Sequence, residues 1–257
     1  MPNESKRLPN AFLLLLLAFC WGFSLYLLKK VLVTFTPYTA ITLRLFLATA
    51  ILYGILKWRK ESLNGWKKYW YHYLFMGLFS TALPFTLIAY SIQTIPTTIA
   101  GIIHCTPSLF TAFLAHYFMK SETISIEKFT GLTFGIGGVL ILLVPALLKY
   151  KITSYIGIGY ILLASLSYSI GMLYSRKYLT HLPPLIGPTN QLLYGALITL
   201  PFAIYFDSTQ QFLMVTPNTL GFLLALSFFS TALTFITPFQ NAQELPTSQQ
   251  QPCSTHV

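Results

Sequence analysis

Eight long apolar stretches dominate this chain and constrain its fold more than any other feature. They are residues 11–28, 38–56, 71–91, 95–118, 129–148, 155–175, 186–206 and 218–237. A helix of about 20 apolar residues crosses roughly 30 Å of hydrocarbon, whereas an open strand in lipid leaves backbone groups unpaired. Only 9% of the 257 residues are charged, too few to cover the surface of a soluble protein. The sequence predicts an all-α integral membrane protein with about eight transmembrane helices.

The distribution of charge and cysteine excludes several classes of function. The net charge is +10, but the basic residues form short clusters between the apolar stretches, which argues against a nucleic-acid partner. Cys20 and Cys105 lie within predicted helices and Cys253 in a polar segment, so we expect neither a disulfide framework nor a metal cluster. The spans contain no histidine paired with a carboxylate, the pattern that would indicate a catalytic site. We therefore expect no enzyme, no cofactor and no bound metal.

The basic residues also predict how the chain is oriented, because Lys and Arg concentrate in cytoplasmic loops. With residues 1–10 in the cytoplasm, the segments on that side hold eleven basic residues: Lys6, Arg7, Lys57, Arg59, Lys60, Lys67, Lys68, Lys120, Lys128, Arg176 and Lys177. The segments on the outer side hold four, namely Lys29, Lys30, Lys149 and Lys151. We expect a multi-pass protein of the cytoplasmic (inner) membrane with a cytoplasmic N-terminus.

One pentapeptide occurs twice, which indicates an internal repeat. The sequence Phe-Ser-Thr-Ala-Leu stands at residues 79–83 and again at residues 229–233. Other landmarks recur in the same order at a similar offset: Trp21 with Tyr168, Pro37 with Pro184, and Arg44 with Gln191. Residues 11–148 contain five predicted helices, so the second copy enters the membrane from the opposite side. Such an inverted repeat of five-helix units is typical of secondary transporters, whose substrate site lies between the halves.

The C-terminal part of the chain departs from this pattern. Residues 155–237 supply three predicted helices of the second unit, so about eight of ten expected helices are accounted for. Residues 238–257 are polar and lack helical periodicity, which is typical of a disordered tail. Because the change falls just after the repeated pentapeptide, we interpret it as a truncation or a reading-frame change. A natural form with eight spans is the alternative.

Arg44 is the basic residue that lies well inside a span. Counted from Tyr38 at 1.5 Å per residue, its Cα lies about 9 Å below the outer boundary. The guanidinium either binds an anion or carboxylate in a central cavity, since intramembrane charges usually face the interior, or snorkels to the interface. A second polar residue, His104, either lines a polar cavity or forms an interhelical hydrogen bond.

Two prolines fall inside predicted spans, at Pro84 and Pro107. A proline inside a helix removes one backbone donor and frees the carbonyl four residues earlier, here Ser80 and Ile103. Such a carbonyl must be paired again by protein, water or substrate. We therefore expect helix-break carbonyl sites, and with them a cavity, near Pro84 and Pro107.

The order and spacing of these motifs resemble the EamA-type members of the drug/metabolite transporter superfamily. The resemblance extends from residue 11 to about residue 236. It rests on Trp21-Gly22, Lys29, Pro37, Thr42-Leu43-Arg44-Leu45, Gly77 through Tyr90, Thr106-Pro107-Ser108-Leu109-Phe110-Thr111-Ala112, Ser121-Glu122, Gly131 to Leu143, and Gln191 in place of the arginine. The family implies ten helices in two inverted five-helix repeats and transport of small metabolites such as amino acids or nucleosides.

We therefore expect a carrier that moves a small metabolite or drug-like solute across the membrane by alternating access. The expected substrate-binding residues are Trp21, Arg44, Tyr90, His104 and Gln191. The expected partners are the lipid bilayer and the small-molecule solute, and a homodimer is one assembly that the sequence leaves open. The alternative is a truncated, inactive remnant or a non-transporting membrane subunit. An intramembrane enzyme is disfavoured.

Overall fold

The fold is seen in a computed structural model, which describes residues 7–60, 69–118, 126–150, 155–179, 185–206 and 215–233. Within these ranges the chain is helical and contains no strand, as predicted. The predicted tail at residues 238–257 and the Ser121-Glu122 motif lie outside the described residues. The prediction of an all-α membrane protein is confirmed.

The helices of the first unit follow the predicted spans closely. They are α1 (Arg7–Val31), α2 (Pro37–Trp58), α3 (Trp70–Met76), η2 (Gly77–Ala82), α4 (Leu83–Thr94), α5 (Thr97–Ile103), α6 (Pro107–Phe118) and α7 (Ile126–Lys149). Those of the second unit are α8 (Ile156–Tyr178), α9 (Ile186–Phe206), α10 (Pro217–Ser227) and η4 (Phe228–Ala232). In the described part, four helical segments are both long and apolar enough to cross a membrane: Pro37–Trp58, Trp70–Thr94, Thr97–Ala115 and Ile156–Tyr178.

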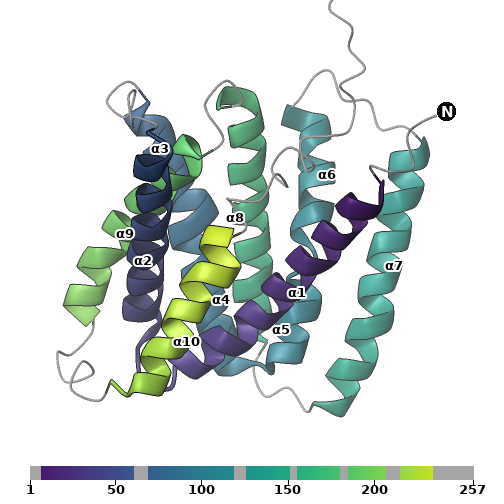
Figure 1. Cartoon of the computed structure of the whole chain (residues 1–257). Coiled ribbons are helices and arrows are strands. Elements are labelled where there is room, and N and C mark those ends of the chain that lie inside the picture. The colour runs from purple at the N-terminus through teal and green to yellow at the C-terminus, as the bar shows by residue number, and fades with distance from the viewer. Residues whose placement is uncertain are drawn as a thin grey trace, which may run out of the picture.

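Equivalent helices of the two units run in opposite directions through the bundle (Figure 1). Helix α1 descends in this view where its counterpart α8 ascends, and α2 ascends where α9 descends. The segment from α3 to α4 likewise descends, whereas α10 ascends. This antiparallel relation is what an odd number of spans in the first unit produces. Helix α2 of the first unit lies beside α9 of the second (Figure 1).

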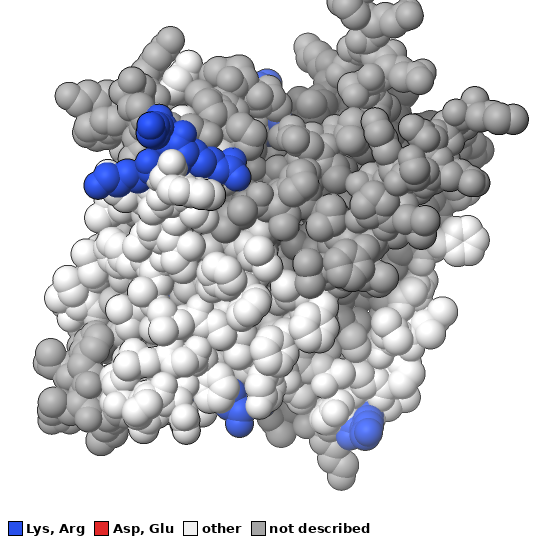
Figure 2. Space-filling model, in the orientation of Figure 1, with Lys and Arg blue, Asp and Glu red and all other residues white. Residues whose placement is uncertain are grey.

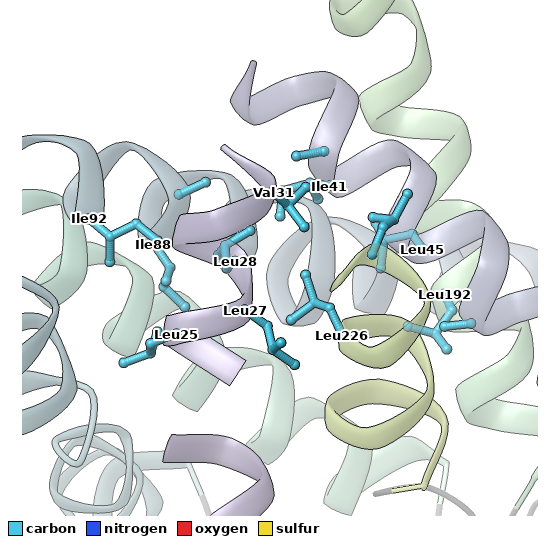
Figure 3. Packing of buried hydrophobic residues seen from close by; sticks show 14 of the residues in the cluster. Leu25, Leu27, Leu28, Val31, Ile41, Leu45, Ile88, Ile92, Leu192 and Leu226 are labelled. Carbon is cyan, nitrogen blue, oxygen red and sulfur yellow. The ribbon is translucent and has the colours of Figure 1, made fainter. Parts of the chain in front are cut away.

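The two units share one apolar core. Side chains from α1, α2, α4, α9 and α10 meet there, including Leu28, Ile41, Leu45, Leu192 and Leu226, each at most 1% exposed (Figure 3). In lipid such packing, and not the expulsion of water, drives helices together. A hydroxyl pair adds a polar link across the same boundary, because Thr42 Oγ1 on α2 donates to Thr199 Oγ1 on α9 at 2.8 Å.

On the face of the molecule that Figure 2 shows, the described Lys and Arg atoms lie at its two ends, with uncharged atoms between them. The apolar side chains between the ends include Phe134, Ile141 and Ile204, which are at least 72% exposed. An exposed apolar belt of this kind fits a lipid environment.

Both copies of the repeated pentapeptide form a short π-helix, η2 in the first unit and η4 in the second. In each, the backbone N–H of the closing leucine bonds to the carbonyl five residues earlier: Leu83 to Leu78, and Leu233 to Phe228. Side-chain hydroxyls bind carbonyls four residues back, from Thr81 Oγ1 to the Gly77 oxygen at 2.6 Å and from Ser230 Oγ to the Leu226 oxygen at 2.9 Å. Hydroxyls that bond back in this way bend helices, and π-helices occur frequently at functional sites.

The π-helix moves the carbonyl freed by Pro84 away from the predicted position. In this register the missing proline N–H corresponds to the carbonyl of Phe79, five residues earlier, and not to that of Ser80. The Phe79 oxygen accepts a hydrogen bond from Ser167 Oγ of α8 at 2.8 Å. A hydroxyl of the second unit therefore pairs the carbonyl that the first unit leaves free.

Pro107 does not kink a continuous helix. It is the first residue of α6, and residues 104–106 form a turn after α5. A proline fits at the first position of a helix because the N–H there needs no intrahelical partner. The Ile103 carbonyl, predicted to be free, accepts from Thr106 N at 2.9 Å and Thr106 Oγ1 at 2.7 Å. The fourth span is thus a broken helix with His104 at the break.

Helices of the two units approach closely around η2, where a glycine is required. A Cβ atom on Gly77 would lie 2.8 Å from the backbone nitrogen of Gly195 and 2.9 Å from Cβ of Tyr194, both on α9. Rigid backbone cannot yield to such a contact. Gly54 on α2 is the contrasting case, since a Cβ there would meet nothing within 4 Å.

We expect Gly77→Ala to lower the thermal unfolding temperature of the detergent-purified protein, because overpacking typically costs about 1–3 kcal/mol. The matched Gly54→Ala variant should unfold at or above the wild-type temperature, because alanine is the better helix former. Equal unfolding temperatures for the two variants would contradict the close contact between η2 and α9.

Candidate functional site

The centre of the candidate site is Arg44, at the eighth position of α2. Its side chain is only 5% exposed. Instead of extending toward the end of the bundle, the guanidinium points across to the π-helix of the second unit. The structure therefore excludes the snorkelling alternative, and anion binding by Arg44 stays a prediction.

Two hydroxyls of the repeated pentapeptide hold the guanidinium. Arg44 Nε donates to Thr231 Oγ1 and Arg44 Nη2 donates to Ser230 Oγ, both at 2.9 Å. The Ser230 hydroxyl in turn donates to the Leu226 carbonyl, which fixes its direction. The π-helix η4 thus presents two oriented acceptors to one edge of the guanidinium.

One aromatic ring packs on this charge, and two further side chains interact with it electrostatically. The guanidinium carbon of Arg44 lies 4.3 Å from the ring centroid of Phe85 on α4, a cation–π geometry. Tyr168 on α8 and His104 at the α5–α6 break both lie close enough to Arg44 to interact with it electrostatically. The site therefore joins parts of both units around one cation.

The charge of Arg44 has no carboxylate partner in the part of the chain that the structure describes. The acidic residue within those ranges is Glu127, on the first turn of α7. An arginine at the centre of a transmembrane helix costs about 2.5–3.5 kcal/mol on insertion scales, and hydroxyls supply acceptors but no negative charge. This arrangement leaves a positive site that a bound anion would neutralise.

His104 contributes an unused polar atom beside the same cation. Its Nδ1 atom is buried and has no hydrogen-bond partner among the described residues. The predicted alternative of an interhelical hydrogen bond is therefore not formed through this atom. Broken helices with polar groups at the break form the substrate sites of many transporters, so the position suits a ligand contact.

The other predicted site residues lie on α4, α1 and α9. Tyr90 packs edge-on against Tyr38 near the N-terminal end of α2, with 5.8 Å between ring centroids. Trp21 is half-buried on α1, and Gln191 is 8% exposed on α9. Their predicted roles in substrate binding stay predictions.

Several residues of the site escaped prediction, although the sequence held a signal for each. Ser230 and Thr231 belong to the repeated pentapeptide, whose recurrence indicated the repeat but not a ligand role. Tyr168 is the repeat counterpart of Trp21, a predicted site residue, and Phe85 recurs as Phe235. Among the described residues, no group of three His, Cys, Asp or Glu side chains could hold a metal ion.

Comparisons with known proteins agree with this architecture. The EamA-like transporter family matches residues 8–144 and 155–255, one match for each repeat. An uncharacterised transporter of Bacillus subtilis (strain 168), YoaV, is 23% identical over 229 residues, which cover 89% of this chain and 78% of the relative. A solved crystal structure is similar in fold with a TM-score of 0.65 at 17% identity, over 86% of this chain and 74% of that one.

If the role of Arg44 is to bind a ligand, replacing it should not destabilise the purified protein in the absence of that ligand. We expect Arg44→Met to unfold at or above the wild-type temperature, because replacing buried charge with apolar groups is often neutral or stabilising. The reciprocal change, Ser230→Ala with Thr231→Val, should lower that temperature, since hydrogen bonds to a charged group contribute about 1.5–3 kcal/mol. A large loss of stability in Arg44→Met would make Arg44 a structural residue.

Proposed function

From the premise that the chain belongs to the EamA-like transporter family, we propose that it carries a small metabolite or drug-like solute across the cytoplasmic membrane by alternating access. The family and the related transporter support a membrane transporter and not an enzyme. The observation that carries the proposal further is the buried Arg44, which bridges α2 of the first unit and η4 of the second. A solute bound there touches both halves.

Alternating access needs contacts between the halves that can open at each end in turn. Toward the outer end, the Tyr38 ring of α2 stacks on Phe202 and Phe206 of α9 at 5.5 Å and 5.6 Å. Toward the other end, His72 Nδ1 of α3 lies 2.7 Å from the Tyr174 hydroxyl of α8. Arg44 lies between these two aromatic contacts along the bundle. In the proposed cycle one contact separates while the other holds.

The direct test is uptake into proteoliposomes by the purified chain. Labelled amino acids, nucleosides and carboxylic acids are offered in turn, and we expect at least one to accumulate. Arg44→Met should reduce that uptake at least about thirty-fold, because truncating one partner of a buried charge pair costs about 2–5 kcal/mol. Glycine 54, far from any contact, provides the control variant Gly54→Ala, which should transport normally.

The same assay distinguishes the alternative class. A protein that inserts and folds normally but moves none of these solutes would favour a non-transporting membrane subunit, including a homodimer that acts only as an assembly. Uptake that survives Arg44→Met would retain the carrier but remove Arg44 from its solute site.

The proposed orientation places the N-terminus and the basic end in the cytoplasm. Among the described residues that end carries Lys57, Arg59, Lys60, Arg176 and Lys177, at the ends of α2 and α8. The opposite end carries Lys29, Lys30 and Lys149. Because Lys and Arg favour the cytoplasmic side, the richer end supports this orientation.

Single cysteines test the orientation in a background that lacks Cys20, Cys105 and Cys253. On intact cells, a membrane-impermeant maleimide should label Lys149→Cys, while Lys60→Cys should react only after the cells are made permeable. The reverse pattern would place the N-terminus outside.

A further inference from the structure

We propose that the site at Arg44 binds an organic monocarboxylate with an aromatic body, and that the carboxylate takes the place of the Ser230 and Thr231 hydroxyls on the guanidinium. This inference rests on the proposed function, because it names the solute class of the same site. Four observations carry it: the shape of the occupied edge, the single charge, the aromatic surroundings and the divergence of the two repeats.

The occupied edge of Arg44 has the geometry that a carboxylate requires. Nε and Nη2 each donate one hydrogen bond of 2.9 Å, to the Thr231 and Ser230 oxygens. A carboxylate presents its two oxygens to this pair of donors as a bidentate fork. It is also the stronger acceptor, because charge-assisted hydrogen bonds are about twice as strong as neutral ones. The two hydroxyls therefore occupy the place of a carboxylate in the empty site.

The charge of the site favours a ligand that carries one negative charge and no positive charge. Arg44 supplies a single buried cation, and the other Lys and Arg side chains of the described region stand at the ends of their helices. A phosphate monoester, at about −1.5 to −2 near neutral pH, would leave negative charge unpaired. An amino acid would bring an ammonium group to a site where the described residues place no carboxylate.

The surroundings of the guanidinium favour a ring on the carboxylate. Phe85 contributes an aromatic face 4.3 Å from the guanidinium carbon. Tyr168 on α8 and His104 at the α5–α6 break interact with Arg44 electrostatically. Aromatic pairs in offset or edge-to-face contact contribute beyond the area they bury. The unpaired Nδ1 atom of His104 offers one further polar contact.

The first copy of the pentapeptide shows that its sequence does not by itself create such a site. A Cβ atom on Gly171 would collide with the Ser80 hydroxyl, and one on Gly195 with the Thr81 hydroxyl. The hydroxyls of η2 are therefore packed against glycines of α8 and α9. Only in η4 do the same two residue types face a cation, so exchange with a ligand is specific to the second copy.

Displacement of the hydroxyls would couple binding to movement. Through its hydrogen bonds to Ser230 and Thr231, Arg44 ties α2 to η4. Once a carboxylate takes the two donors, that tie between the units is released and η4 is free to shift. A ligand changes a conformational equilibrium only through different contacts in the two states, and this exchange supplies such a difference.

The test is calorimetric titration of the detergent-purified protein with 3-phenylpropionate and matched probes. We expect 3-phenylpropionate to bind at least about ten-fold more tightly than 3-phenylpropionamide, L-phenylalanine or phenyl phosphate, because only it matches one buried positive charge. Arg44→Met should weaken its binding at least about thirty-fold. Preference for the amide, the amino acid or the phosphate, or unchanged binding in Arg44→Met, would overturn the proposal, as would no binding of 3-phenylpropionate.

The exchange itself predicts a gain of affinity. Ser230→Ala with Thr231→Val removes the competing hydroxyls and should tighten 3-phenylpropionate binding roughly ten-fold, since each hydrogen bond to a charged group is worth more than 1 kcal/mol. The matched control is Ser80→Ala with Thr81→Val in the first copy, which should leave binding within about two-fold. Weaker binding in the second-copy variant would make the hydroxyls ligands of the solute and refute the exchange.

The experiments can reject the carboxylate site and the carrier function independently of each other. Arg44-dependent binding without uptake into proteoliposomes would retain the carboxylate site and reject the carrier. Uptake of a neutral or cationic solute that does not depend on Arg44 would retain the carrier and reject the carboxylate site.

Discussion

The hydrogen bonds from Arg44 to Ser230 and Thr231 are the interaction that joins the two units at the candidate site. An arginine buried in an apolar bundle is costly unless its donors are satisfied and its charge is neutralised. The two hydroxyls satisfy donors without neutralising charge, so the empty protein retains a positive centre between its halves. Three features bear on that centre: η4 carries the hydroxyls, Phe85 lies over the guanidinium, and His104 at the α5–α6 break interacts with it electrostatically. If Arg44 served only the stability of the fold, replacing it with an apolar side chain would destabilise the protein.

The two copies of Phe-Ser-Thr-Ala-Leu show how one sequence supports two tasks. Both form π-helices, and in each a hydroxyl bonds to the carbonyl four residues earlier. In the first copy Gly171 and Gly195 let α8 and α9 approach the hydroxyls directly. In the second the partner is Arg44, whose repeat counterpart is Gln191. The first π-helix therefore serves helix packing, whereas the second accepts hydrogen bonds from Arg44. This difference between the two units places the cation beside the second copy only.

Most of the fold followed from the sequence, whereas the site followed only in part. Span positions were predictable because hydrocarbon thickness fixes helix length, and the inversion because the first unit has five spans. Arg44 could be singled out because a cation inside a span is rare. Its orientation could not, since snorkelling and burial differ only by the packing of α2 against η4. The carbonyl freed by Pro84 was misassigned by one residue because a π-helix leaves no mark in local periodicity. Tyr168 was overlooked although it is the counterpart of Trp21, because contacts between units depend on tertiary packing.

A crystal structure of the protein with 3-(4-bromophenyl)propionate would test the central claim most directly, because bromine marks the ligand by its anomalous signal. The expected result is a bromine peak beside Phe85 and Tyr168, with both carboxylate oxygens on Nε and Nη2 of Arg44 and the Ser230 and Thr231 hydroxyls displaced. A peak elsewhere, with Arg44 still bound to both hydroxyls, would contradict it.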